Sequence, residues 1–200
     1  MQGLTGELGV RLKKDMLIKF IENLEKQLES LKKGLDYAQI EEFINLIENS
    51  RCVFVMGAGR SGFIAKAFAM RLMHLGYDVY VVGETVTPRI KQEDVLISIS
   101  GSGETTSVVN ISKKAREIGC KLVAITYSKN STLAGMSDVT VTRNAKIKTQ
   151  NHDKELSKVA PLGTMFEVTS FILLDGVIAE LMNRKGITEE DLLERHAVLE

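Results

Sequence analysis

Two short stretches of glycine and hydroxyl residues each follow an apolar run that is typical of a buried strand. The first is "GAGRSG" at 57–62, and the second is "SGSGET" at 100–105. Glycines let a backbone approach a ligand closely, and helix N-termini that follow such loops favour anions. The loop residues that suit this role are Ser61, Ser100, Gly101, Ser102, Gly103 and Thr105. Many neutral donors with little basic charge predict a site for one phosphate group.

The first stretch alone also satisfies the G-x-G-x-x-G fingerprint of dinucleotide-binding proteins. That fold needs an acidic residue near the end of the second strand, and Glu84 is a candidate for this role. A dinucleotide needs no second serine-rich loop, which favours the phosphate hypothesis. A third interpretation is purely structural: Ser102 caps a helix and the glycines form a turn. Because Glu104 is unfavourable beside an anion, we expect it to point away and interact with the helix end.

Glu167 lies near the start of the most apolar helical stretch, which covers residues 164–182. In one interpretation it completes a capping box and reaches back to the amide of Thr164. In the other it is a general base. Apolar neighbours such as Met165 and Phe166 would desolvate its carboxylate and make it a better proton acceptor. The residues alone leave both interpretations open.

Two further side chains are candidates for a role in chemistry. Arg60 lies inside the first glycine stretch, where it either meets oxygens of a substrate or stays a solvated loop residue. His196 lies in "ERHAVLE" on an expected helix, and it is either a surface residue or a second acid/base group that reaches a neighbouring subunit's site. The three histidines lack partners at metal-ligand spacing, so we expect no metal and no cofactor.

Alternating apolar runs and amphipathic segments indicate how these residues are positioned. The expected strands cover 52–56, 79–82, 94–99, 121–126 and 139–142. The helices between them include 61–75 and 105–118. Near-continuous apolar strands that alternate with helices predict an α/β fold with three layers and a doubly wound parallel sheet. With the strand order 2-1-3-4-5, strands one and three are neighbours, and the two glycine loops face one crevice.

The 200 residues fit one domain. Its expected parts are a loose start at 1–10, two helices within 11–49, a phosphate-binding core at 51–143, a polar loop at 144–160 and C-terminal helices at 161–200. Asp36 is expected to cap the second helix. The first helix carries an apolar stripe that is either intramolecular core or a dimer seam. That stripe consists of Leu17, Phe20, Ile21, Leu24, Leu28 and Leu31.

The composition of the chain argues against nucleic acid and membranes as partners. The 26 basic and 26 acidic residues give zero formal net charge, so no overall basic field attracts nucleic acid. No apolar run has the ~18 residues of a membrane-spanning helix, and the first residues lack the layout of a signal peptide. Cys52 and Cys120 are expected to be free, buried thiols. Free thiols fit a reducing compartment, so we expect a cytoplasmic protein.

The segments "GAGRSG", "ISGSGETTSV" and "STLAGMSD" together resemble the SIS (sugar isomerase) domain over about 51–138. Four more segments are similar to the 6-phospho-3-hexuloisomerase family: 69–88, "APLGTMFE", "LDGVIAELM" and "ERHAVLE". This resemblance implies a homotetramer with sites at subunit contacts, which interconverts D-arabino-hex-3-ulose 6-phosphate and D-fructose 6-phosphate. It also implies that the serine-rich loops hold the phosphate and that Glu167 is the catalytic base.

Two alternatives stay open, one among enzymes and one among proteins without catalytic activity. The first is another sugar-phosphate isomerase of the SIS type, since the sequence does not fix the stereochemistry of the sugar. The second is a phosphosugar sensor with the same crevice and no chemistry. The segment 11–49 contains no basic recognition helix, which counts against a DNA-binding repressor.

Overall fold

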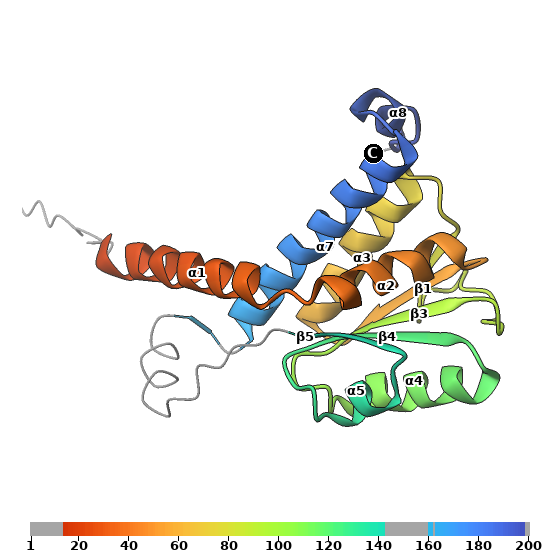
Figure 1. The fold of residues 1–200 in the computed structure, drawn as a ribbon, viewed down its shortest axis with the longest axis horizontal. Helices are drawn as coiled ribbons and strands as arrows, with labels where there is room; N and C mark the ends of the chain where they lie inside the picture. Colours follow the sequence, from red (N-terminus) through yellow and green to blue (C-terminus); the bar gives the residue numbers. More distant parts are fainter. Residues whose placement is uncertain (1–13, 143–159, 162, 199–200) are drawn as a thin grey trace, which may run out of the picture.

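The structure is a computed structural model that describes residues 14–142, 160–161 and 163–198. The expected loose start at 1–10 and the loop at 144–159 lie outside the described residues. The described part is built on a single sheet, and the helices lie on its two faces (Figure 1).

Five parallel strands form the sheet in the order β2-β1-β3-β4-β5, which confirms the predicted order. The strands are β1 (Val53–Gly57), β2 (Val79–Val81), β3 (Val95–Ile99), β4 (Lys121–Thr126) and β5 (Val139–Thr142). In the register of the central pair, Gly57 lies opposite Ile99. The loops after β1 and β3 therefore leave from neighbouring points on the carboxyl edge of the sheet.

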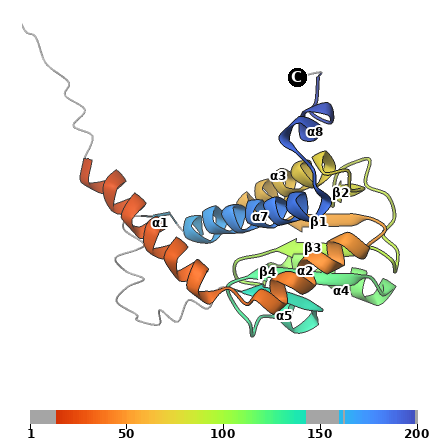
Figure 2. The same ribbon diagram turned by 45° about the horizontal axis from the view of Figure 1, so that its top comes forward.

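Helices cover both faces, as the apolar strands predict (Figures 1 and 2). One face carries α2 (Tyr37–Asn49), α3 (Arg60–His74) and α7 (Thr164–Lys185), and the other carries α4 (Thr106–Ile118) and α5 (Thr132–Met136). Successive residues of β1 alternate between the two cores: Val53 and Val55 join the first, and Phe54 and Met56 join the second. Asp36 caps α2 as predicted, because its side chain accepts a hydrogen bond from Gln39 N.

The first helix, α1 (Lys14–Gly34), projects away from the sheet, and only its C-terminal part packs against the body (Figures 1 and 2). Burial along its apolar stripe follows this geometry. Leu31 is buried, whereas Ile21 is 43% exposed and Leu17 is 66% exposed. Intramolecular packing therefore explains only the C-terminal end of the stripe.

Helix α7 is apolar almost all round, which is typical of a helix buried against the sheet or a partner chain, and within one chain only part of it is buried. Its inner side packs into the core through Leu174, Val177 and Leu181. Phe171 and Ile172, in its N-terminal half, are 43% and 41% exposed. Exposed apolar residues on both α1 and α7 leave a surface that a single chain does not cover.

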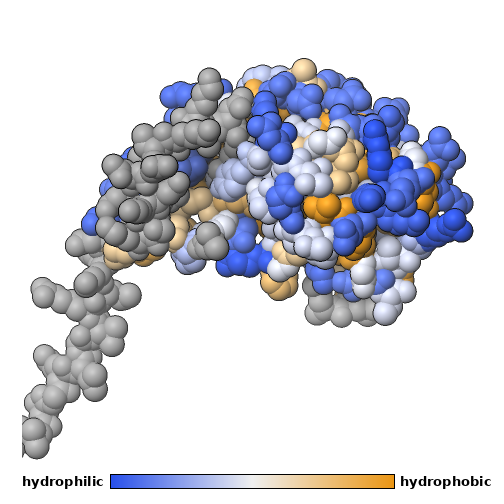
Figure 3. Space-filling model, turned by 90° about the horizontal axis from the view of Figure 1, so that it is seen from below, coloured by the Kyte–Doolittle hydropathy of each residue, from blue (hydrophilic) through white to orange (hydrophobic). Residues whose placement is uncertain are grey.

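The chain closes with the short helix α8 (Glu189–Glu194), near the C-terminal end of α3 (Figure 1). Seen from below, the uncovered part of the molecule is mostly hydrophilic, with hydrophobic residues in small separate areas (Figure 3). Within the described ranges no helix is long and apolar enough to cross a membrane. Cys52 and Cys120 are free and buried, as expected.

Candidate active site

The loop after β1 turns directly into α3, and glycine makes this tight connection possible. A Cβ atom on Gly57 would lie 2.6 Å from backbone atoms of Ser61, so only glycine allows this approach of strand and helix. Ser61 and Arg60 consequently lie in the first turn of α3, at the carboxyl edge of the sheet. Both residues therefore lie at the edge of the sheet where the crevice is predicted.

The loop after β3, residues 100–105, is organised around the hydroxyl of Ser100. Ser100 Oγ accepts a hydrogen bond from Gly103 N at 3.1 Å and lies 2.9 Å from Thr105 Oγ1. Only one of those two hydroxyls donates to the other, so one proton of the pair stays available for a ligand. We call residues 100–105 the serine loop.

Ser102 does not cap a helix, so this part of the structural interpretation is wrong. Helix α4 begins four residues later, at Thr106, and Thr105 occupies its N-cap position. Ser102 Oγ instead accepts a hydrogen bond from Glu104 N at 3.1 Å, inside the loop. An oxygen that accepts in this way keeps its own proton to donate. In the described part of the chain, no side chain caps the first turn of α3 or α4.

Glu167 does not form the expected capping box. The amide of Thr164 already donates to Pro161 O at 3.1 Å, so it offers no donor to the carboxylate. Glu167 instead accepts a hydrogen bond from Arg60 Nε and forms an ion pair with it. The Glu167 side chain is 14% exposed and that of Arg60 is 62% exposed. The two candidates, which the sequence suggested separately, therefore meet across the crevice.

Phe166 connects the serine loop to Glu167. A Cβ atom on Gly101 would lie 3.2 Å from the Phe166 ring, so the loop rests directly against α7. The ring of Tyr127 packs against the same phenylalanine at a centroid distance of 4.8 Å, and Tyr127 N donates to Gly101 O at 3.1 Å. The serine loop therefore lies against the first turn of α7, which also carries Glu167.

The side of Glu167 away from the serine loop is apolar. A cavity of about 480 Å³ is lined by Arg60, Phe63, Ile64, Glu167, Val168, Phe171 and Ile172. Only Arg60 and Glu167 among these residues are charged. Apolar side chains therefore border the carboxylate, but Met165 and Phe166 are not among those that line this cavity, and Phe63 is 71% exposed.

His196 lies far from this site within its own chain. It follows α8 rather than lying on a helix, and its ring stacks on His74 at a centroid distance of 5.3 Å. His74 is the last residue of α3, whereas Arg60 is the first. At ~1.5 Å per residue, those two ends are about 20 Å apart. His196 therefore does not assist Glu167 of the same chain.

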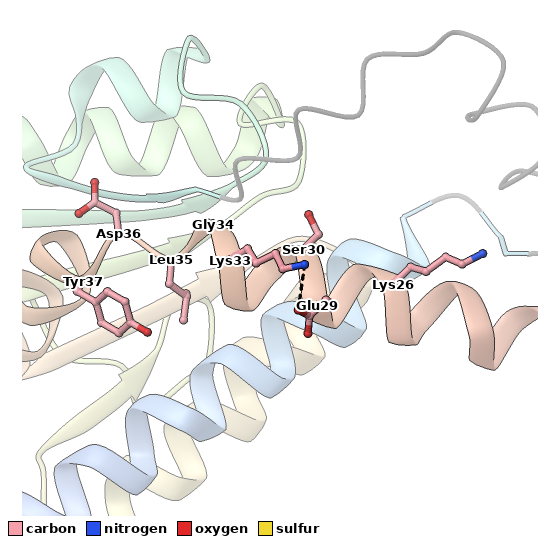
Figure 4. Close-up of a pocket in the computed structure, with 8 residues that line it drawn as sticks. All are labelled: Lys26, Glu29, Ser30, Lys33, Gly34, Leu35, Asp36 and Tyr37. Carbon is pink, nitrogen blue, oxygen red and sulfur yellow. Dashed lines mark ion pairs between the residues drawn. The ribbon is translucent and has the colours of Figure 1, made fainter.

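Two other features do not belong to the site. The carboxylate of Glu84, the candidate ribose ligand, pairs with Lys66 on α3 at 2.6 Å. A wide hollow of about 780 Å³ lies at the elbow between α1 and α2 (Figure 4). Its charged side chains include Lys33 and Glu29, which pair with each other at 3.1 Å on the exposed helix surface. Across the described residues, no group of three or more potential ligands is placed to hold a metal ion.

The fold and this site can now be compared with known proteins. The family model of the SIS domain matches residues 46–167. This match includes both glycine loops and ends at Glu167. The chain belongs to the SIS domain family.

Its relatives within that family include named isomerases. A protein of Methanocaldococcus jannaschii named 3-hexulose-6-phosphate isomerase is 41% identical over 80% of this chain and 84% of its own length. A protein of Bacillus subtilis with the same name is 35% identical over 92% of this chain and 100% of its own. A crystal structure from Methanococcus jannaschii, from which that function was inferred, has a TM-score of 0.80 at 37% identity and covers 91% of this chain and 99% of its own. These relatives make the chain an isomerase of the SIS family.

Proposed function

We propose that this protein interconverts D-arabino-hex-3-ulose 6-phosphate and D-fructose 6-phosphate. The observation that supports the proposal is the contact between Gly101 of the serine loop and Phe166, the neighbour of Glu167 in the first turn of α7. A phosphate held at one end of an open-chain sugar fixes the distance from that end to the reacting carbons. The relatives named 3-hexulose-6-phosphate isomerase support this choice of sugar.

In the proposed mechanism, Glu167 removes the proton from C2, next to the C3 carbonyl. The electron pair forms a cis-enediolate, and negative charge develops on the former carbonyl oxygen. The hydroxyl proton on O2 passes to O3, the same carboxylate returns the carbon-bound proton to C3, and the carbonyl is left at C2. One base serves both carbons because both protons lie on one face of the enediolate. The mechanism requires no metal.

Arg60 has two parts in this mechanism. Before the substrate binds, its guanidinium pairs with Glu167 and keeps this carboxylate oriented toward the crevice. When the enediolate forms, the same cation is placed to stabilise the charge on oxygen. Its long, largely exposed side chain allows it to move between these two partners.

The proposal includes a homotetramer in which subunit contacts complete the site. The exposed apolar residues of α1 and α7 support an interface, and Phe63, Phe171 and Ile172 border the cavity beside Glu167. A second copy that covers them would close the open side of this cavity and exclude water. In such an assembly His196 acts on the site of a neighbouring subunit, since it lies away from the site of its own.

The α1 seam gives a direct test of assembly. Replacing Leu17 and Ile21 together with Glu places two charges on the exposed part of the stripe. We expect the variant to run as a smaller species in size-exclusion chromatography with light scattering, because burying unpaired charges at an interface is costly. Lys19→Glu is the matched control, since residue 19 lies on the opposite side of the helix and should leave the assembly unchanged. Equal masses for all three proteins would contradict the seam.

The proposed reaction is the second step of the ribulose monophosphate route, which fixes formaldehyde and also runs in reverse to supply pentose phosphate. The free, buried thiols of Cys52 and Cys120 fit the proposed cytoplasmic location. Burial raises the pKa of the Cys120 thiol to about 11, so this thiol stays protonated and unreactive at neutral pH.

A coupled assay tests the function. Fructose 6-phosphate is supplied together with hexulose-phosphate synthase, and the release of formaldehyde is followed with and without a chelator. We expect release that depends on this protein and is insensitive to the chelator. No release, with a synthase shown to be active on hex-3-ulose 6-phosphate, would contradict the proposed reaction and direct attention to other phosphosugars or to a sensor.

A further inference from the structure

Glu104 is the only acidic residue in the serine loop, and a carboxylate beside a phosphate repels it. The structure shows where this charge is directed. Both oxygens of Glu104 accept hydrogen bonds from Thr132: one from the amide and one from the hydroxyl, each at 2.7 Å. Thr132 is the first residue of α5, which follows β4 in the sequence. The carboxylate therefore fastens the loop to another helix.

The two donors of Thr132 hold the pKa of the Glu104 carboxyl below its usual range, the hydroxyl having the larger effect. A carboxyl group with a lowered pKa is ionised at neutral pH, so both of its oxygens act as acceptors. A negative charge at the first turn of a helix is also favourable. The negative charge of Glu104 is thus stabilised by donors at the start of α5, and the carboxylate does not point into the serine loop.

A second contact reinforces the same junction. Leu133 N donates to Gly103 O at 3.0 Å. A Cβ atom on Gly103 would lie only 2.1 Å from Ser131 Oγ, so the loop backbone lies directly on the start of α5. The serine loop therefore packs directly against residues 131–133.

The backbone of Glu104 connects this junction to the phosphate donors. Glu104 N donates to Ser102 Oγ at 3.1 Å. This bond sets the orientation of the Ser102 hydroxyl, whose proton is left for a ligand. If the side chain of Glu104 were released from Thr132, the amide that orients Ser102 would be released with it.

We propose that Glu104 is a positioning residue for phosphate binding, which holds the serine loop on α5 so that its hydroxyls face the phosphate. The inference rests on the proposed function, because it takes the serine loop to be the phosphate site. Glu104 touches neither the phosphate nor the reacting carbons. It acts through Ser102 and through the position of the loop backbone.

This role is tested by whether Glu104→Gln binds phosphate ligands more weakly or more tightly than the wild type. In Glu104→Gln the side chain keeps its length and an acceptor for the Thr132 amide, but it loses the negative charge, and the Thr132 hydroxyl must accept from the new NH₂ group and no longer donates to a carboxylate. We expect the dissociation constants of fructose 6-phosphate and of inorganic phosphate, measured by calorimetry, to rise about tenfold, since hydrogen bonds to charged groups are the stronger ones. A charge that acted only by repulsion would give the opposite result: removing it would tighten binding. Tighter or unchanged binding overturns the proposal.

Further variants separate positioning from a general loss of stability. Thr132→Val keeps the amide donor and loses the hydroxyl, so we expect a smaller loss of affinity than in Glu104→Gln. The double variant should bind no more weakly than Glu104→Gln alone, because both changes break one junction. Glu117→Gln on α4 is the matched control and should bind like the wild type. A lower melting temperature with unchanged affinities would mark a merely structural role and overturn the proposal.

Activity separates this inference from the function on which it rests. In a positioning role KM rises while kcat stays within about twofold, because the interaction is the same in the ground and transition states. A wild-type protein that binds fructose 6-phosphate without isomerising it would contradict the proposed reaction, and the affinities of the variants would still decide the role of Glu104. A wild-type protein that binds neither ligand overturns the phosphate site and this inference together.

Discussion

Glu167→Gln is expected to lower kcat for the isomerisation by about 10³- to 10⁴-fold, which is the upper part of the range for a general base. The amide has the shape of the carboxylate but accepts no proton from carbon. The affinity for fructose 6-phosphate, measured by calorimetry, should stay close to that of the wild type, because the serine loop is unchanged. Steady-state rates at saturating substrate measure the effect on kcat.

Glu180→Gln is the matched control for this variant. It makes the same substitution on the same helix, at a surface residue that pairs with Arg184. We expect it to keep wild-type turnover. If Glu167→Gln retained activity within about tenfold of wild type while its melting temperature fell, Glu167 would be a structural residue and the proposed mechanism would be wrong.

Gly103→Ala should weaken phosphosugar binding by at least about 30-fold, the change that ~2 kcal/mol produces. Two costs add up at this position. Gly103 has a φ of +68°, which L side chains rarely adopt, and a Cβ atom there would lie 2.4 Å from Ser131 Cβ. Either the serine loop or the start of α5 must move. Calorimetry with fructose 6-phosphate measures the loss.

Two further variants distinguish the steric collision with Ser131 from the backbone strain at Gly103. Gly135→Ala, in α5, is the control because nothing lies within 4 Å of the added atom and φ is ordinary there. It should bind like the wild type. Adding Ser131→Gly to Gly103→Ala removes the two closest contacts but leaves Thr126 Oγ1 at 3.0 Å and the strain at φ. Gly103→Ala should therefore cost less affinity in the Ser131→Gly protein than in the wild type. Unchanged binding by Gly103→Ala would mean that the loop does not hold the phosphate.

The sheet could be predicted from the sequence because apolar runs that end at glycine specify strand and turn together. Each expected strand lies within one residue of the observed one, and the order 2-1-3-4-5 is confirmed. What the pattern could not settle is which partner covers an amphipathic helix. The stripe of α1 is regular throughout, yet Leu31 is buried and Leu17 is not. Periodicity gives the face of a helix and not the chain that covers it.

The sequence indicates which residues are candidates for the site, but not which of them form hydrogen bonds or ion pairs with one another. Ser102 and Glu167 both fit local capping patterns, but neither side chain caps a helix. Ser102 accepts a hydrogen bond from Glu104 N inside the loop, and Glu167 accepts one from Arg60. The amide of Thr164 binds Pro161, and Glu167 binds Arg60, 107 positions away in the sequence. Glu104 was expected to interact with a helix end, and it binds the start of α5 through Thr132, a partner for which the sequence carries no signal. Long-range partners of this kind arise from the order of strands in the sheet.

Deuterium exchange into fructose 6-phosphate tests the central claim most directly. The protein is incubated with fructose 6-phosphate in D₂O, and the sugar is followed by NMR. Proton transfer between C2 and C3 predicts deuterium at C3, together with the appearance of hex-3-ulose 6-phosphate and no label at C1. Deuterium at C1 would identify a different, aldose-forming isomerase, and fructose 6-phosphate that stays unlabelled and unconverted would contradict the proposed reaction.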